Sequence, residues 1–331
     1  MTTTPPDHAA PGTDPRAAYR DALLRLAEHD ERVLCLDSDT GGLENTFGAR
    51  FPDRYLNVGI AEANMLSVAS GLAARGYRPY VHTMATFATT RAAEQLKLDV
   101  VGNALPVGVV ATHSGLSATH LGTTHYALED LAVVRALAEM TVVVPASGAE
   151  VGPALHAAHR RPGPTYLRLG RSATPDIRPE DAGFELGSAA TLRSGTDATV
   201  IAMGPYPVLM ALEAAHALAW EGVSCRVLQV HTLVPLDTAA VLAAARTTAG
   251  IVTVEEHRPQ GGLGDAVAAT VSAEHPLPHR RVAVTGEVGV VVQEHREALE
   301  AADVSAAAIR TAVAHVIETG RGNRHDWPTL G

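Results

Sequence analysis

The sequence predicts an α/β protein of two domains, each a parallel β-sheet covered by helices on both faces. Short runs rich in Val, Ile and Leu, without the alternation of half-exposed strands, are interleaved with longer helical patterns along the chain. Residues 175–194, rich in Pro, Gly, Asp and Ser, separate two such series. For 331 residues we therefore expect a disordered tail over 1–14, a first domain over 15–174, a linker over 175–194, a second domain over 195–318 and a tail over 319–331.

Six buried strands and four helices are predicted in the first series. The strands are Val33–Leu36, Tyr55–Val58, Arg78–Val81, Val107–Ala111, Thr141–Val144 and Thr165–Leu169. The helices are Ala61–Arg75, Arg91–Val101, Leu128–Ala138 and a helix that starts after Ser147 and runs through Ala158. The helix Ala61–Arg75 has apolar residues at helical spacing, and Gly76 follows it, as expected just beyond a helix C-terminus.

The second series continues the same pattern. Its predicted strands are Thr199–Ala202, Cys225–Val230, Ile251–Val254 and Arg281–Val284. Its predicted helices are Val208–Trp220, Thr238–Arg246, Gly264–Ser272 and Ser305–Ile317. Strands that alternate with helices favour parallel sheets in both domains.

Composition and charge exclude several classes of function. The formal net charge of −10 is unfavourable for binding a phosphate backbone, so we expect no nucleic-acid partner. No apolar run reaches the roughly 20 residues that span a membrane, and the N-terminus carries no secretory signal. Cys35 and Cys225 lie in apolar runs, which favours buried thiols over a disulfide. We therefore expect a cytoplasmic location and no membrane partner.

Sequence motifs exclude several kinds of chemistry. Lys97 is the only lysine and lies inside a predicted helix, which disfavours Schiff-base catalysis. The chain contains no Gly-x-Ser-x-Gly, His-Glu-x-x-His or Cys-x-x-Cys motif, and no Gly-x-Gly-x-x-Gly follows a predicted strand.

Polar side chains follow the predicted strands of the first domain. They are Asp37 and Asp39, Glu62, His82, His113 and Arg171, and the aromatic side chain of Phe87 follows His82 along the chain. Because ligands bind outside the carboxyl ends of parallel strands, we expect these side chains to form one site.

Glu62 is the most informative of these residues. It falls in the first turn of a predicted helix, where a carboxylate is stabilised by the helix dipole alone. However, Val58, Ile60, Ala61 and Met65 give it apolar surroundings, which suit a carboxyl group that shares a proton with a ring nitrogen.

Several motifs resemble the transketolase family. Those of its pyrimidine-binding domain are YLNVGIAEANM at 55–65, THSGL at 112–116, GTTH at 122–125 with Glu129-Asp130, and YLRLGR at 166–171. The segments VTVEEH at 252–257 and GGLG at 261–264 are similar to the family's C-terminal domain. The resemblance covers residues 15–318 and implies a fold of these two domains.

The resemblance also implies a cofactor and the residues that hold it. Glu62 matches the glutamate that binds the N1′ nitrogen of the thiamine diphosphate aminopyrimidine, and Phe87 matches the aromatic residue that stacks on this ring. Met84 stands where the family often has a second aromatic residue. Asp39 matches an aspartate near the cofactor.

The substrate residues are implied in the same way. His113 and Arg171 match residues that hold the phosphate of a sugar phosphate, and we expect Arg16, just before the first helix, to join them. His125 matches a histidine that contacts the donor near the reacting carbon. Leu121 replaces an aspartate that reads a donor hydroxyl in full-length transketolases.

Two further features of the sequence bear on metal binding. His113, His120 and His125 fit no metal-binding spacing, so we expect no metal site made by this chain. The Gly-Asp-Gly and downstream Asn that bind Mg2+ and the diphosphate in related enzymes are missing. We therefore expect a separate N-terminal, diphosphate-binding subunit that ligates most of the Mg2+, in an α2β2 assembly.

The leading hypothesis is the C-terminal subunit of a split transketolase that moves a two-carbon ketol unit from a ketose phosphate to an aldose. One alternative is the β subunit of a 2-oxoacid dehydrogenase E1, which shares the fold. The other is a non-catalytic scaffold or regulatory partner. The presence of Glu62 disfavours the non-catalytic hypothesis, and His113, His125 and Arg171 favour a sugar phosphate.

Overall fold

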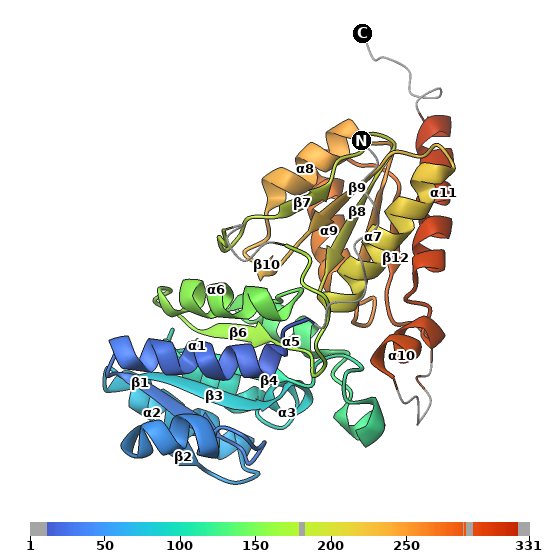
Figure 1. The fold of residues 1–331 in the computed structure, drawn as a ribbon. Helices are drawn as coiled ribbons and strands as arrows, with labels where there is room; N and C mark the ends of the chain where they lie inside the picture. Colours follow the sequence, from blue (N-terminus) through green and yellow to red (C-terminus); the bar gives the residue numbers. More distant parts are fainter. Residues whose placement is uncertain (1–11, 179–182, 287, 289–293, 324–331) are drawn as a thin grey trace.

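The computed structural model describes residues 12–178, 183–286, 288 and 294–323, and shows two α/β domains in contact (Figure 1). The first domain holds a seven-stranded sheet of order β10-β5-β6-β4-β3-β1-β2. Its strands are β1 (Val33–Asp37), β2 (Tyr55–Asn57), β3 (Arg78–Met84), β4 (Gly108–Thr112), β5 (Thr141–Val143), β6 (Thr165–Arg168) and β10 (Thr232–Val234). All neighbours pair in parallel except β10 and β5.

Helices cover both faces of this sheet. On one face lie α1 (Pro15–His29) and α6 (Gly148–His159), which pack against each other. On the other lie α2 (Glu62–Ala74), η3 (Leu96–Val101) and α5 (Asp130–Ala136). The short elements are η1 (Glu44–Gly48), η2 (Pro52–Arg54), α3 (Ala85–Thr89), α4 (Ala93–Gln95), η4 (Thr119–Leu121) and η5 (Thr123–His125).

The second domain is a five-stranded sheet of order β12-β11-β8-β9-β7. Its strands are β7 (Ala190–Arg193), β8 (Ala198–Met203), β9 (Cys225–Gln229), β11 (Ile251–Glu255) and β12 (His279–Val282), and only β7 is antiparallel to its neighbour. One face is covered by α7 (Pro205–Trp220) and α11 (Ala306–Asn323), and the other by α8 (Thr238–Thr247) and α9 (Leu263–Glu274). The short helix α10 (His295–Ala301) packs beside α7 and α11.

The hydrophobic core is continuous between the two domains. One cluster of buried side chains includes Leu66 and Val109 of the first domain together with Met203, Leu228 and Val267 of the second. A second cluster, built on α7 and α11, also takes in Leu116, Tyr126 and Leu128 of the first domain. Burial of this kind stabilises by about 25 cal/mol per Å² of apolar surface, so the two domains pack as one body.

The structure confirms the fold class but shows that each sheet carries one antiparallel edge strand. The linker expected over 175–194 ends in β7, which pairs with β9. This edge strand is only partly buried and lacks the apolar run of an inner strand. Strand β10 continues from the second domain into the first sheet, a long-range pairing that local patterns do not encode.

Three smaller differences concern ends of elements. The tail expected from 319 begins as helix, since α11 runs to Asn323, while 324–331 lie outside the described residues, as do 1–11 of the predicted N-terminal tail. The sequence predicts Arg16 just before the first helix, but it lies in the first turn, because Pro15 begins the helix and Asp14 caps it. No helix among the described residues is long and apolar enough to cross a membrane.

Candidate active site

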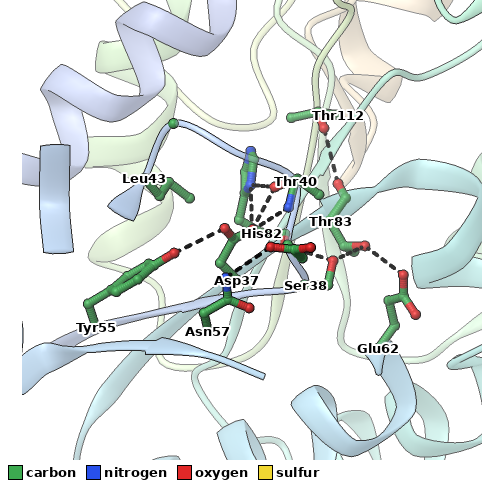
Figure 2. A network of polar contacts seen from close by, with 12 residues as sticks. Asp37, Ser38, Thr40, Leu43, Tyr55, Asn57, Glu62, His82, Thr83 and Thr112 are labelled. Carbon is green, nitrogen blue, oxygen red and sulfur yellow. Dashed lines mark hydrogen bonds and ion pairs between the residues drawn. The ribbon is translucent and has the colours of Figure 1, made fainter. Parts of the chain in front are cut away.

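The carboxyl ends of four parallel strands meet at one edge of the first sheet. Strands β1, β3, β4 and β6 end at Asp37, Met84, Thr112 and Arg168, and they are followed by Asp39, Phe87, His113 and Arg171. Glu62 follows β2, whereas His82, expected after a strand, lies inside β3, because β3 runs on to Met84. The close-up of this edge in Figure 2 shows a chain of polar contacts that runs from Tyr55 to Glu62. It passes through Asp37, His82, Ser38 and Thr83.

Glu62 is almost completely buried, with 2% of its surface exposed, although it carries a carboxylate. It is the first residue of α2, where the helix dipole favours negative charge. Its Oε2 accepts a 2.6 Å hydrogen bond from Arg91, and its Oε1 lies 3.5 Å from the hydroxyl of Thr83. The Thr83 hydroxyl is itself held by Ser38 at 2.8 Å, so the carboxylate has a fixed orientation (Figure 2).

A second network fixes the loop that follows β1. Asp37 is fully buried and accepts hydrogen bonds from Thr40 at 2.6 Å and from Tyr55 at 3.1 Å. The Thr40 hydroxyl also lies 2.6 Å from Nδ1 of His82, and Tyr19 stacks on the His82 ring. Burial raises the pKa of Asp37, but hydrogen bonds from His82 and Thr40 outweigh it and lower that pKa overall.

Asp39 lies in this loop, with an exposed side chain and a positive φ of 63°. Its Oδ1 accepts a 3.2 Å hydrogen bond from Asn57 at the end of β2. The carboxylate is therefore accessible at the same edge of the sheet.

Phe87 lies in α3 with its ring partly exposed. The guanidinium carbon of Arg91 lies 4.4 Å from the centroid of the Phe87 ring, and His125 approaches the same ring edge-on at 5.3 Å. Met84, three residues before Phe87, is also partly buried and forms the N-cap of α3. Arg91 thus contacts both residues that the sequence assigns to the cofactor ring, Glu62 and Phe87.

Basic side chains from three elements form a cluster at the same edge of the sheet. His113 follows β4, Arg171 follows β6, and Arg16 belongs to α1. Burial, reinforced by Arg16 and Arg171, lowers the pKa of His113 to about 4. Within the described residues, Arg16 forms an ion pair with Asp14 alone, at 3.9 Å, and its buried Nε has no hydrogen-bond partner. The cluster is therefore suited to bind an anion.

His120 completes this basic cluster. Its Nδ1 lies 3.1 Å from Nη1 of Arg171 and accepts a hydrogen bond from it. Burial, with Arg171 and His125 nearby, lowers the pKa of His120. His113, His120 and His125 do not converge on one point, and no group of three His, Cys, Asp or Glu suited to a metal occurs in the described part of the chain.

His113, His120 and His125 all lie on one loop, residues 113–127, which we call the histidine loop. It begins at the end of β4, and Gly115 and Ala127 close its base as an antiparallel bridge with hydrogen bonds of 3.1 and 2.9 Å. Leu121, which stands where an aspartate was expected, is 39% exposed on this loop. The loop therefore places the three imidazoles and Leu121 above the strand ends.

The residues present fit one half of thiamine diphosphate. A buried carboxylate beside a partly exposed aromatic ring matches the aminopyrimidine, which carries ring nitrogens and a flat face. By contrast, the helix N-terminus at Gly262, where an anion could have bound, is filled by Glu255. Its carboxylate accepts 2.7 Å hydrogen bonds from the amides of Leu263 and Gly264.

Comparison with known proteins agrees with this geometry. A family model described as the transketolase pyrimidine binding domain matches residues 12–176, and one described as the transketolase C-terminal domain matches residues 187–315. The chain is also 40% identical over 280 residues to the 6-deoxy-6-sulfo-D-fructose transketolase subunit SqwH of Clostridium sp. strain MSTE9. That match covers 83% of this chain and 87% of the relative.

The chain belongs to the transketolase family. A second relative, an apulose-4-phosphate transketolase subunit of Phocaeicola vulgatus, is 35% identical, with 82% of this chain and 88% of the relative covered. A solved structure described as a split gene transketolase, inactive beta4 tetramer, superposes with a TM-score of 0.85 at 37% identity, covering 94% of this chain and 100% of that one. The predictions of family, fold and a transketolase-type transferase subunit are confirmed.

Sequence reasoning missed several residues of this transketolase-family site. Arg91 is predicted only as the first residue of a helix, whereas in the structure it lies in the turn after α3, four residues beyond Phe87. Thr83, Ser38 and Thr40 are not recognisable as orienting groups, because short hydroxyl residues at strand ends carry no motif. Glu256 lies in the segment VTVEEH, but nothing in that segment indicates its contact with a loop of the first domain.

Proposed function

We propose that this chain is the C-terminal subunit of a two-subunit transketolase and moves a two-carbon ketol unit from a ketose phosphate to an aldose. The observation that carries the proposal is the pairing at one sheet edge of a buried carboxylate, Glu62, with a basic cluster that includes His113 and Arg171. The buried carboxylate suits a cofactor ring, and the basic cluster suits the charged end of a sugar phosphate.

The cofactor supplies the nucleophilic carbon that breaks and remakes the carbon–carbon bond when it is bound. Glu62 would hold a proton at the N1′ ring nitrogen, and Thr83 would keep the carboxylate turned towards it. Phe87 would stack on the ring, Met84 would lie beside Phe87, and Asp39 would lie near the cofactor at the exposed edge of the site. His125, next to Phe87, would donate a hydrogen bond to a donor hydroxyl near the reacting carbon.

The charged end of the donor would lie on the basic cluster. Arg171 and Arg16 would bind two phosphate oxygens, and His113 would donate one further hydrogen bond. The names of the two relatives support an anionic group on the sugar, since one name contains a sulfo group and the other a phosphate. For this chain a sugar phosphate remains part of the proposal.

The metal-binding half of the site belongs, in this proposal, to a separate N-terminal subunit. The described residues present no metal-ligating group of three, whereas a diphosphate needs a cation such as Mg2+ to offset its charge. We propose an α2β2 assembly in which that subunit ligates Mg2+ and the diphosphate. A cytoplasmic location is also proposed, because Cys35 and Cys225 are buried free thiols, as is usual in a reducing compartment.

A Glu62→Gln variant tests the proposed function. Mixed with the diphosphate-binding subunit, thiamine diphosphate, Mg2+ and a ketose phosphate, it should lose about 100-fold or more in kcat, because an amide cannot hold the proton at the ring nitrogen. Transfer is measured by coupled detection of the aldose product, and assembly by light scattering, which should be unchanged.

Glu94→Gln is the matched control, since Glu94 is an exposed glutamate on the neighbouring helix α4. It should transfer at the wild-type rate. Near-normal turnover of Glu62→Gln in an intact assembly would contradict the assignment of Glu62, and a wild-type mixture that cleaves no ketose phosphate would contradict the proposed function.

A further inference from the structure

A buried carboxylate of the second domain binds the backbone at the base of the histidine loop. Oε1 of Glu256, just after β11, accepts a 2.6 Å hydrogen bond from the backbone amide of Leu116. The same oxygen lies 2.6 Å from Nε2 of His295, and Glu256 is 4% exposed. A buried amide that loses its acceptor is costly, so this contact holds the loop in place.

Three further contacts show that the loop base is built onto the second domain. Gly115 has φ +60°, and a Cβ added there would overlap the Glu256 carboxylate, so loop and carboxylate pack directly together. Leu116 and Tyr126, on the two arms of the loop, belong to the hydrophobic cluster of α7 and α11. Arg168 donates to the carbonyls of both Ala127 and Glu256, at 3.0 and 3.1 Å.

We propose that Glu256 is a positioning residue for substrate binding, which acts by fixing the histidine loop and with it His113 and His125. The inference rests on the proposed function, in which these histidines contact the donor. It also gives the second domain a role in the reaction, since this domain provides the surface on which the loop is held. A displacement of about 1 Å at reacting groups is enough to reduce turnover strongly, so such a contact has catalytic consequences.

The first test is hydrogen exchange of the whole chain, which needs neither cofactor nor partner. In Glu256→Ala, the amides of residues 113–127 should exchange at least about tenfold faster than in the wild type, because the Leu116 amide loses its acceptor. In Glu256→Gln, exchange should stay within about twofold of the wild type, since the amide oxygen still accepts from Leu116. Unchanged exchange in Glu256→Ala would overturn the proposal.

The second test is kinetic and separates positioning from folding. In the assembled enzyme, Glu256→Ala should raise KM for a ketose phosphate about tenfold, and Glu256→Gln should restore it. A merely structural role would lower the amount of active enzyme and leave KM unchanged. Faster loop exchange with an unchanged KM would therefore overturn the positioning role.

Glu213→Ala is the control for both tests. Glu213 on α7 accepts two hydrogen bonds from Arg296, the residue next to His295 on α10, and these bonds lie within the second domain rather than at the histidine loop. The Glu213→Ala substitution disturbs the same domain, but it should change neither the hydrogen exchange of the histidine loop nor KM. If the wild-type mixture transfers no two-carbon unit, the proposed function fails, while the exchange experiment still decides whether Glu256 holds the loop.

Discussion

Among single residues, Arg91 stands out because it engages both side chains assigned to the cofactor ring. Its guanidinium donates to Glu62 and covers the face of Phe87, the two surfaces that an aminopyrimidine would use. Its side chain is 44% exposed, so it can turn towards solvent at little cost. In the proposed complex, Arg91 would therefore have to move away from Glu62 and Phe87 when the cofactor ring binds.

An Arg91→Ala variant should bind thiamine diphosphate more tightly in the assembled enzyme. Removing a partly exposed competing hydrogen bond of about 1 kcal/mol should lower the Kd roughly fivefold. The measurement is isothermal titration with Mg2+ present. Arg75→Ala, at an exposed arginine just beyond α2, should leave the Kd unchanged. Weaker binding by Arg91→Ala would instead make Arg91 a ligand of the cofactor.

Arg171 is the residue through which the charge of the donor is expected to act. An Arg171→Ala variant should raise KM for a ketose phosphate by about 10- to 100-fold, since it removes hydrogen bonds to a charged group. KM for an unphosphorylated ketose should change little. The exposed Arg161, beyond α6, provides the control substitution Arg161→Ala. Equal effects on both donors would show that Arg171 does not bind the phosphate.

Among the elements, the histidine loop depends most on exact packing. Two of its glycines have positive φ, but only one is crowded. Gly115 faces the Glu256 carboxylate, whereas Gly122 has nothing within 4 Å of an added Cβ. The loop is thus tight at its base and open at its tip, which fits a rigid support for side chains that meet a substrate.

The two glycines allow a matched comparison. Gly122→Ala should lower the free energy of unfolding by about 1 kcal/mol, because alanine is strained at positive φ. Gly115→Ala should cost a further 1–3 kcal/mol, roughly, because its Cβ also displaces a buried carboxylate from its hydrogen bond. Urea unfolding followed by circular dichroism measures both. Equal losses of unfolding free energy in the two variants would mean that the Glu256 carboxylate moves away from the added Cβ without a loss of stability.

For the whole molecule, buried titratable groups in both domains make stability depend on pH. Burial lowers the pKa values of His113, His231 and His279 to about 4, with nearby arginines as a further cause. Between pH 6.5 and 4 the unfolded chain therefore binds more protons at these sites, and stability falls as pH falls. Glu255 acts in the opposite direction, since burial raises its pKa to about 7.

The free energy of unfolding should therefore fall between pH 7 and pH 5. Each of the three histidines lowers the free energy of unfolding by about 2 kcal/mol over this range, and Glu255 raises it by about 2 kcal/mol. The net loss is about 4 kcal/mol. Urea unfolding at several pH values measures this loss. His113→Asn should recover about 2 kcal/mol at pH 5, while the same change at the exposed His156 should not alter the profile. A rise of about 2 kcal/mol in the free energy of unfolding, the contribution of Glu255 alone, would show that these histidines are protonated in the folded chain.

The sequence by itself determined the fold class, most strands and helices, and the edge of the sheet at which the site lies. Buried strands and amphipathic helices leave local periodic patterns, and the carboxyl ends of parallel strands necessarily share an edge. Glu62, Phe87, His113 and Arg171 could therefore be placed together without coordinates. Only the tertiary structure decided that Arg91 contacts Glu62 and Phe87. The same holds for the contact of His120 with Arg171 and for the hydrogen bond from the histidine loop to Glu256. The contact between Leu116 and Glu256 joins residues 140 positions apart, and no local pattern encodes a hydrogen bond across that separation.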